Sequence, residues 1–434
     1  MSCLNMTYSC PADWAMLRDR LASRHNPGES VEARVQDILA QIRARGDQAL
    51  VEYTRRFDCP DFDLTRLAVA QADLAQALDR IPATDLDILQ QAIANIRAYH
   101  AHQAEKSWWT TAPDGTILGQ MVRPVDRVGL YVPGGQAGTT PLISSLIMNA
   151  VPAQVAGVSE IAVVSPPTKD GSLNPYLLAT AKLLGLTEIW RAGSAWAIAA
   201  LAFGTASIRP CDVLAGPGNI YVTTAKRLLV GQVGIDMIAG PSEIAILADD
   251  SAKGAWLAAD MLSQAEHDPL ASAVLITTSP KVAEDTRQAL IAQTAALPRS
   301  DIAAKALADY GAIVLVPDLR MGADLVNRLA PEHLELALAD PWSALGLIRH
   351  AGAIFMGHHC PEPVGDYFAG PNHVLPTLGT ARFSSALSVQ AFLKKSSLIA
   401  TTPGYLREHG TKIARLARLE GLEAHARSVE ERLK

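Results

Sequence analysis

Residues 128–135 read VGLYVPGG, an uninterrupted apolar run that ends in a proline and two glycines. Such a run is typical of a strand buried on both faces and followed by a turn. The chain continues into a helical pattern through Ile147 and Val151, and a second apolar run follows at 161–164. A strand, a helix and another strand in this order predict a βαβ unit with parallel strands.

The same alternation continues along most of the chain. Amphipathic helices are predicted from Val31 to Ile42 and from Leu177 to Leu184. Short apolar runs predict further strands at 213–214, 244–247, 274–277, 313–316 and 353–355. These strands are too many for one modest sheet. We therefore expect an α/β fold of two doubly wound, incomplete Rossmann-like parallel-sheet modules that join near 236–241.

The last part of the chain has a different character. From Arg407 to Lys434 it is charged and rich in Leu and Ala, without an apolar run of the strand type. We therefore expect a small helical tail. A tail of this composition either packs on another subunit or lies in solvent as a terminal helix, and composition does not decide between the two.

Composition excludes several classes of protein. The 434 residues are 49% hydrophobic and 19% charged, which is typical of a folded chain with more than one domain. A net charge of −6 and the lack of any long basic run argue against a nucleic-acid partner. We recognise no secretion signal and no apolar stretch of about 18 residues that would span a membrane. The five scattered cysteines lack CxxC spacing, which favours a reducing cytoplasm.

The polar segment SQAEHD at 263–268 needs an explanation because it ends a predicted helix. Gln264 and His267 lie three positions apart, so a helix presents both side chains on one face. An amide oxygen and an imidazole directed at one point are suitable ligands for a metal ion. The alternative is an ordinary helix C-terminus, where His267 interacts favourably with the helix dipole.

Other acidic and imidazole side chains form further groups. Glu332 and His333 are adjacent, and on a helix they would point about 100° apart and serve different substrate atoms. Asp366 lies in a loop after a predicted strand, where parallel sheets bind their ligands. Each of these groups is also common on protein surfaces, and so are Glu420 and His425 in the tail.

Two glycine turns complete the pattern. Residues 133–135 (PGG) and 216–219 (GPGN) each follow a predicted strand, where flexible backbone lets a phosphate approach closely. Neither turn has the GxGxxG spacing of a dinucleotide-binding loop. The residues alone therefore predict an α/β enzyme with scattered Gln, Glu, His and Asp side chains, and metal binding is one use for them.

Nine segments together resemble the histidinol dehydrogenase family over nearly the whole chain. In order, they are VGLYVPGG (128–135), AIAALAFGT (197–205), GPGN (216–219), GIDMIAGPSE (234–243), LSQAEHD (262–268), PEHLE (331–335), GDY (365–367), NHVLPT (372–377) and EGLEAH (420–425). The resemblance implies an enzyme of the last step of histidine biosynthesis. Such an enzyme oxidises L-histidinol through L-histidinal to L-histidine with two molecules of NAD.

The resemblance also implies roles for residues of this sequence. The implied zinc ligands, for one ion per subunit, are Gln264, His267, Asp366 and His425. Glu332 and His333 match the catalytic acid/base pair, and Tyr131 and Asn219 match NAD-contacting positions. The implied substrate-binding positions are Ser242, Gln264, His267, His333, Asp366, Glu420 and His425. The family is a homodimer whose C-terminal tail crosses over, so His425 is expected to complete the zinc site of the second subunit.

We expect three parts of the chain on this basis. Residues 29–135 with 241–380 form a first α/β module that carries the zinc and catalytic residues. Residues 136–240 form a second module on the NAD side. Residues 1–28 with 381–434 form a small helical region that is exchanged in the homodimer. We expect a cytoplasmic enzyme with L-histidinol as its small-molecule substrate and with no nucleic-acid or membrane partner.

In the implied mechanism, zinc holds the imidazole and amino nitrogens of the substrate so that the carbinol carbon faces nicotinamide. The anionic Glu420 suits a cationic substrate. His333 takes the hydroxyl proton as the first hydride leaves. Glu332 then activates water to form the hydrated aldehyde, from which a second NAD takes the second hydride.

One position departs from the family pattern. The family commonly has Gly-Gly-Ala-Gln before AIAALAFGT, and the Gln contacts NAD, whereas this chain has GSAW at 193–196. The indole of Trp196 only donates a hydrogen bond, so it does not reproduce an amide. Trp196 either stacks on the cofactor or the contact is lost, which leaves the choice between NAD and NADP open.

Three other functions fit parts of the pattern. A paralogue of the same fold would oxidise another small alcohol such as a sulfonated diol, but Glu420 would repel an anionic substrate. The four implied zinc ligands would also serve a zinc hydrolase, which would leave both glycine turns and Tyr131 without a role. A non-catalytic binding protein does not account for the Glu332–His333 pair.

Overall fold

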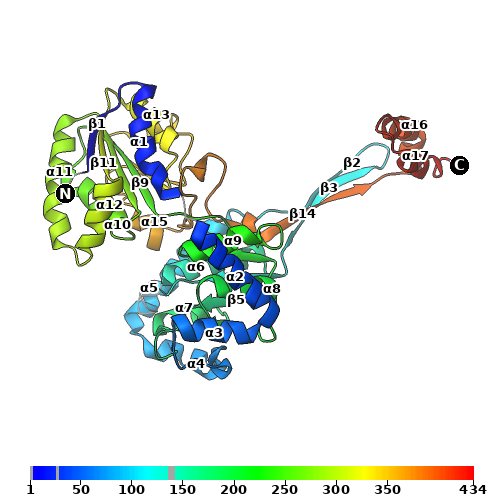
Figure 1. Cartoon of the computed structure of the whole chain (residues 1–434). Helices are drawn as coiled ribbons and strands as arrows, with labels where there is room; N and C mark the ends of the chain where they lie inside the picture. The colour runs from blue at the N-terminus through cyan, green and yellow to red at the C-terminus, as the bar shows by residue number, and fades with distance from the viewer. Residues whose placement is uncertain (1–2, 26–28, 135–141) are drawn as a thin grey trace. The chain divides into compact units, whose positions relative to one another are not determined.

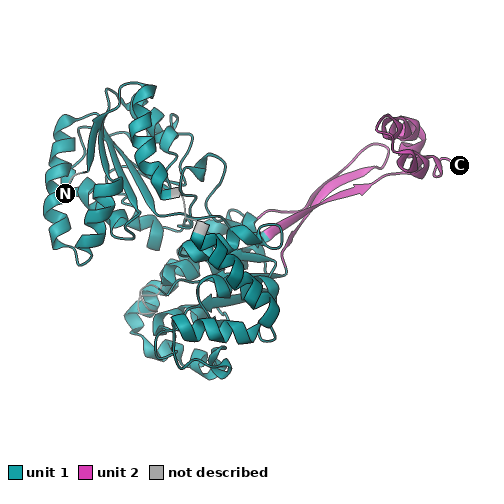
Figure 2. Ribbon diagram, viewed as in Figure 1, with its two compact units in different colours: residues 1–103, 126–392 teal, residues 104–125, 393–434 magenta. Residues whose placement is uncertain are grey.

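The computed structural model describes residues 3–25, 29–134 and 142–434. The chain divides into two compact units, residues 1–103 with 126–392 and residues 104–125 with 393–434 (Figure 2). The first unit holds two parallel sheets flanked by helices, and the second holds an antiparallel ribbon and two helices (Figure 1). The predicted α/β class with a helical C-terminal region is therefore confirmed.

The larger sheet has six parallel strands in the order β1-β11-β10-β9-β12-β13. They are β1 (Leu4–Thr7), β9 (Glu243–Ala248), β10 (Ser272–Thr277), β11 (Ala312–Leu315), β12 (His333–Ala337) and β13 (Ala353–Met356). Ile244 and Ile246 of β9 pack under α10 (Gly254–Ala265), α11 (Pro280–Ala296) and α12 (Ser300–Tyr310). Ala245 and Leu247 pack with α1 (Trp14–Ala22) and α13 (Leu319–Leu329). Alternate residues of one strand thus enter two separate cores.

The smaller parallel sheet has five strands in the order β6-β5-β4-β7-β8. They are β4 (Arg127–Tyr131), β5 (Glu160–Ser165), β6 (Glu188–Arg191), β7 (Val213–Ala215) and β8 (Gly234–Ile235). One apolar cluster joins the sheet to α2 (Glu29–Arg45), α3 (Asp47–Phe57), α8 (Ser194–Phe203) and α9 (Ile220–Leu229). α6 (Ile143–Ala156) packs on β4, and α5 (Ala83–Ala101) and α7 (Pro175–Leu183) pack on α6.

The second unit is built from chain segments that are far apart in the sequence. β3 (Ile117–Pro124) pairs antiparallel with both β2 (Trp108–Thr111) and β14 (Leu393–Ala400). The ribbon leads into α16 (Pro403–Leu419) and α17 (Glu423–Glu430), which contact each other. Arg418 joins these helices through ion pairs with Glu423 (2.8 Å) and Glu430 (2.6 Å). Among the described residues, no helix is long and apolar enough to cross a membrane.

Every strand predicted from an apolar run is present, but the sheets group the segments differently from the expected boundaries. β1 pairs with β11, so residues 4–7 lie in the six-stranded sheet and not with the tail. β4 lies between β5 and β7, which puts it in the five-stranded sheet and not with residues 241–380. The physical reason is that pairing partners, and not proximity in the sequence, decide where a strand lies. Gly135 of the first glycine turn lies outside the described residues.

Candidate active site

Glu332 and His333 lie at the amino end of β12, between β9 and β13. They are 7% and 3% exposed, and Glu332 Oε2 is 3.6 Å from His333 Nδ1. The pair does not lie on a helix, so the 100° separation of a helix does not apply: His333 is the first residue of a strand. Successive side chains of a regular strand point to opposite faces, but Glu332 precedes the strand and its side chain lies near the imidazole ring. The pair is thus a buried carboxyl–imidazole couple at the amino edge of the six-stranded sheet.

The main chain of Glu243 holds both members of the pair. Its peptide N–H donates a 2.9 Å hydrogen bond to Glu332 Oε2. Its carbonyl oxygen lies 3.0 Å from His333 Nδ1. Because a carbonyl only accepts, the proton of the neutral imidazole lies on Nδ1. In this neutral form His333 Nε2 carries a free lone pair.

Two carboxylates approach this second nitrogen of His333. Asp366 Oδ1 lies 3.6 Å and Glu362 Oε1 3.8 Å from Nε2. Both acids come from α15 (Pro363–Tyr367) and its N-cap, four positions apart. The expectation that Asp366 lies beyond the carboxyl ends of the strands is wrong, because the chain turns back after β13 and brings α15 to the amino edge. Gly365 permits this approach, since a Cβ there would come within 2.7 Å of the Phe355 ring.

The other sequence-predicted residues of this unit lie on neighbouring elements. Gln264 is in the last turn of α10 and is 1% exposed, and His267 follows the helix at an exposed position. Loss of hydration lowers the pKa of His267, while the charge of Asp366 acts in the opposite direction. Ser242 directly precedes Glu243, and its carbonyl accepts a 3.0 Å hydrogen bond from the Ser272 N–H.

Burial and charge act against each other in this group. Burial raises the pKa of Glu332 to about 8. Burial alone would lower the pKa of His333, but the carboxylates of Glu332, Asp366 and Glu362 raise it to about 10. The ring therefore holds a second proton unless a bound cation offsets these negative charges. Burial and the charge of Asp366 raise the pKa of Glu362 to about 8. Burial opposes ionisation of Asp366 as well, yet the neighbouring His333 and His373 rings hold its pKa at about 2. Asp366 is therefore the ionised carboxylate of the group.

The donor atoms here fit a divalent metal ion. Among the described residues, the buried side-chain atoms without a hydrogen-bond partner include Gln264 Oε1, His333 Nε2 and Asp366 Oδ1. One ligand atom from each of His333, Glu362 and Asp366 lies within 4.8 Å of the others. Unpaired buried lone pairs are rare and call for an explanation, and nitrogen and oxygen donors of this kind are those that zinc accepts. A cation there would satisfy atoms that the protein leaves unpaired.

Glu420 and His425 belong to the second compact unit. Glu420 ends α16 as its C-cap, and His425 lies in α17. Both are exposed. They therefore remain predictions from the resemblance alone.

A cavity of about 1250 Å³ opens beside the carboxyl ends of β4 and β5 in the five-stranded sheet. Tyr131, Ser194, Trp196 and Asn219 all line it. The Tyr131 hydroxyl accepts a 3.2 Å hydrogen bond from the Ser194 N–H, and the Asn219 side chain caps α9. The amino ends of α8 and α9 thus border the cavity, where helix dipoles favour phosphate. The two predicted cofactor positions lie together.

Comparison with known proteins identifies the relatives of this chain. The sequence pattern of the family described as histidinol dehydrogenase matches residues 21–433. A histidinol dehydrogenase of Oleidesulfovibrio alaskensis is 64% identical over 433 residues, which cover all of both chains. One from Nitratidesulfovibrio vulgaris is 61% identical over 432 residues, covering 100% of this chain and 99% of its own. The chain belongs to the histidinol dehydrogenase family.

The fold agrees with this membership. A crystal structure of histidinol dehydrogenase from Elizabethkingia anophelis superposes with a TM-score of 0.93 at 34% sequence identity. The superposition covers 99% of this chain and 98% of the other. The resemblance inferred from nine sequence segments is therefore confirmed over the whole length.

Within the histidinol dehydrogenase family, the Trp196 departure has a clear structural setting. The indole is 5% exposed and stacks on Tyr53 at 5.7 Å and on Phe57 at 5.5 Å between ring centroids. It is therefore an aromatic wall of the large cavity, and its Nε1 has no hydrogen-bond partner among the described residues.

Sequence reasoning assigned no role to three contributors to the site. Glu362 carried a usable signal, because it precedes Asp366 by four residues, the spacing of one helix face. His373 also reaches the site, and its Nδ1 lies 3.0 Å from the Asp366 carbonyl. The Glu243 main chain carried no signal, since backbone contacts do not depend on residue type.

Proposed function

We propose that this chain is an L-histidinol dehydrogenase that makes L-histidine in two NAD-dependent oxidations through L-histidinal. The observation that carries the proposal is the buried Glu332–His333 pair with the unpaired Asp366 Oδ1 3.6 Å from His333 Nε2. That arrangement lies in a chain that matches the family from residue 21 to residue 433. It supplies a base, a second base and metal donors in one place.

Gln264, His267 and Asp366 would hold one zinc ion per subunit, with His425 contributed by a second copy of the chain. The bound ion would supply a fixed positive centre that orients the substrate nitrogens and stabilises developing negative charge on oxygen. Ser242 and Glu420, the latter again from the second copy, would complete the substrate site. Glu362 Oε1 lies 3.8 Å from His333 Nε2, and Glu362 offers a ligand atom within 4.8 Å of one from Asp366, so it would border the ion.

His333 would remove the hydroxyl proton while the carbinol C–H leaves as hydride to the first NAD. In the neutral ring, the Nδ1 contact with Glu243 leaves Nε2 as the proton acceptor. This step yields L-histidinal, NADH and one proton.

Glu332 would then take a proton from water, whose oxygen adds to the aldehyde carbon to give the hydrated aldehyde. Burial raises the pKa of this carboxyl, which makes its ionised form a stronger base than an exposed glutamate. The hydrate loses a second hydride to a second NAD and forms the carboxylate. The two oxidations together consume one water and two NAD and release three protons.

The cavity lined by Tyr131, Trp196 and Asn219 would hold NAD. Its position fits the rule that parallel sheets bind dinucleotides where the strand order reverses, because β4 lies between β5 and β7. The aromatic wall offers a stacking surface for a base ring, and helix amino ends offer dipoles for phosphate.

We also propose that the enzyme is a cytoplasmic homodimer in which the second unit crosses to the other subunit. Trp109, Ile399, Leu416 and Leu419 of that unit are each more than half exposed. Large apolar side chains gathered on a small unit favour contact with another chain. The free thiols of all five cysteines fit a reducing compartment.

The first test is NADH formation by the purified, zinc-loaded protein with L-histidinol. We expect about two NADH per L-histidinol consumed, with L-histidine as product, since each hydride transfer yields one NADH. Turnover of a sulfonated or other small alcohol without turnover of L-histidinol would replace the substrate in this proposal. Hydrolysis without any nicotinamide would contradict it and favour a zinc hydrolase.

A further inference from the structure

The Glu332 and His333 side chains both form hydrogen bonds with the main chain of Glu243, one with its N–H group and one with its carbonyl group. The Glu243 N–H binds the Glu332 carboxylate, and the Glu243 carbonyl binds His333 Nδ1. Glu243 is the first residue of β9, at the edge where the regular ladder begins. A shift of residues 241–243 would therefore move the base and the imidazole together.

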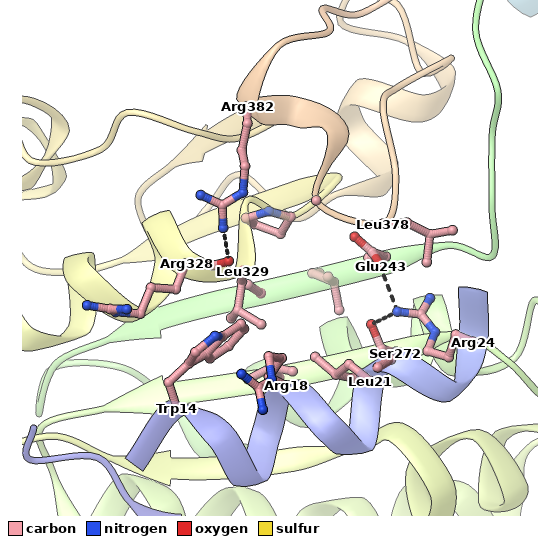
Figure 3. A pocket seen from close by; sticks show the side chains of 16 residues that line it. Trp14, Arg18, Leu21, Arg24, Glu243, Ser272, Arg328, Leu329, Leu378 and Arg382 are labelled. Carbon is pink, nitrogen blue, oxygen red and sulfur yellow. Dashed lines mark hydrogen bonds and ion pairs between the residues drawn. The ribbon is translucent and has the colours of Figure 1, made fainter. Parts of the chain in front are cut away.

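All three nitrogens of the Arg24 guanidinium donate hydrogen bonds, two of them to residues 241–243. Its Nη1 donates to Glu243 Oε1 at 2.7 Å and to Ser272 Oγ at 2.9 Å. Its Nη2 donates to the carbonyls of Pro241 at 3.0 Å and Ser242 at 3.2 Å, and its Nε to the carbonyl of Leu270 at 2.6 Å. The Arg24 side chain is 1% exposed. Figure 3 shows its guanidinium directed at Glu243 and Ser272.

Fold stability alone does not account for a buried ion pair at this point. β9 is already held on both sides by β10 and β12, and its side chains enter two apolar cores. A buried ion pair loses the hydration of both charges, and a well-packed apolar pair would often be as stable. A planar guanidinium instead fixes several acceptors in one geometry, which Lys does not do.

We propose that Arg24 is a positioning residue for catalysis: it fixes residues 241–243 so that the Glu243 main chain holds Glu332 and His333 in place. The inference rests on the proposed function for the reaction, but the contacts themselves do not depend on it. Arg24 touches neither reacting atoms nor cofactor positions. It acts through Glu243.

Kinetics of Arg24→Lys and Arg24→Ala in the zinc-loaded holoenzyme test the proposal. A misplacement of about 1 Å costs up to about 100-fold in rate, so we expect kcat to fall roughly 10- to 100-fold in both variants. KM for NAD should stay within about threefold, because the cofactor cavity is elsewhere in the fold. Arg18→Met is the matched control, since Arg18 lines the same cavity of about 370 Å³ as Arg24 and pairs with exposed Asp19. Its kcat should be unchanged.

Guanidinium rescue separates positioning from general stability. Removing the Arg24 side chain opens space beside the cavity, so guanidinium ion at low millimolar concentration should restore at least about a fifth of wild-type kcat to Arg24→Ala. Arg24→Lys keeps the positive charge and a side chain of similar length. If Arg24→Ala does not fold, the kcat of Arg24→Lys is the test. Wild-type kcat in a folded Arg24→Lys would overturn the proposal. So would a loss that guanidinium does not restore in folded Arg24→Ala.

A readout without turnover keeps this test distinct from that of the proposed function. The His333 Nδ1 proton is hydrogen-bonded to a carbonyl and should give a downfield proton resonance, assigned by its loss in His333→Asn. We expect the resonance to shift or broaden in Arg24→Lys and to stay in Arg18→Met. An unchanged resonance in Arg24→Lys would overturn the proposal even if wild type does not oxidise L-histidinol. Absence of wild-type turnover alone would instead contradict the proposed function.

Discussion

Glu332 and His333 share the Glu243 main chain but face different partners. His333 directs its free nitrogen toward Asp366 and Glu362, whereas Glu332 accepts from the Glu243 N–H. The two side chains therefore fit two separate proton transfers, one from the alcohol and one from water.

Replacing Glu332 by Gln tests this division. The amide oxygen keeps the hydrogen bond from Glu243, but it accepts no proton from water. We expect oxidation of L-histidinal to fall about 100- to 1000-fold and the first oxidation of L-histidinol to fall by less than about tenfold. Single-turnover NADH formation from each substrate measures the two losses. Equal losses in both oxidations would contradict the assignment of Glu332 as the water activator.

Asp58 makes stability depend on pH. Burial raises its pKa to about 7, and its Oδ2 has no hydrogen-bond partner among the described residues. The unfolded pKa is about 3.9, so the folded state holds the extra proton between about pH 4 and pH 7. Asp58 therefore does not reduce the free energy of unfolding below about pH 4, where it is protonated in both states. As pH rises from about 4 to about 7, the free energy of unfolding falls. Above that pH the cost of burying the charge stays constant.

Asp58→Asn should therefore stabilise the protein at alkaline pH. We expect a gain of roughly 1–3 kcal/mol at pH 8 and a smaller one at pH 5, because only the charged form is penalised by burial. Thermal unfolding at the two pH values measures the difference in Tm. Asp61→Asn is the control for the substitution itself, since Asp61 is exposed in the same loop. An Asp58→Asn effect that is the same at both pH values would contradict the pKa shift.

Several residues of the candidate site were predictable from the sequence, because carboxylate and imidazole side chains are the usual acids, bases and metal ligands of enzymes. Motifs identify Glu332, His333 and Asp366. In the structure, Glu332 Oε2 and Asp366 Oδ1 each lie 3.6 Å from a ring nitrogen of His333. Arg24 was not predictable, because it lies 219 positions from Glu243 and its role depends on a tertiary contact. No local pattern carries such information.

At the scale of elements, strands made of uninterrupted apolar residues were predictable from the sequence, whereas a strand that mixes apolar and charged residues was not. β9 and β10 are apolar over most of their length and buried throughout, so periodicity was sufficient. β12 begins with His333 and contains Glu335. The sequence predicts site residues at Glu332 and His333 and no strand at this point. The burial of β12 comes from neighbours on both sides, which the local sequence does not encode.

The contact between α3 and α8 offers a prediction at this scale. Tyr53 and Phe57 of α3 stack on Trp196 of α8 with interplanar angles of 14° and 21°. Trp196→Gln would insert an amide into an aromatic stack, and we expect a loss of about 2–4 kcal/mol in stability. KM for NAD should rise several-fold, since the ring also lines the large cavity, while KM for L-histidinol stays unchanged. Thermal unfolding and initial rates measure the two effects.

Trp196→Phe is the matched control for this prediction. It keeps an aromatic ring with less area, so it should lose about 1 kcal/mol and keep most of the NAD affinity. A Trp196→Gln variant with unchanged Tm and unchanged KM for NAD would contradict both parts of the argument.

At the scale of the whole molecule, the second unit raises the question of what covers it. Its two segments are short for a stable core of their own, and its ribbon exposes Trp108 by 54% and Trp109 by 63%. It also carries Glu420 and His425, the two predicted site residues that lie outside the first unit. Exposed apolar area and predicted ligands on one unit are both explained by a second copy of the chain.

Mixed dimers test that explanation directly. If His425 serves the other subunit, a dimer of one Gln264→Ala chain and one His425→Asn chain has one site with both defects and one with none. We expect each homodimer to be inactive and nearly zinc-free, and the mixed dimer to recover about half of the wild-type activity and one zinc per dimer, because ligand removal costs metal affinity. Differently tagged chains, co-expressed and purified through both tags, allow activity and zinc content to be measured on the same sample. A site built within one chain would leave both sites of the mixed dimer defective, so no recovery would rule out a site shared between subunits.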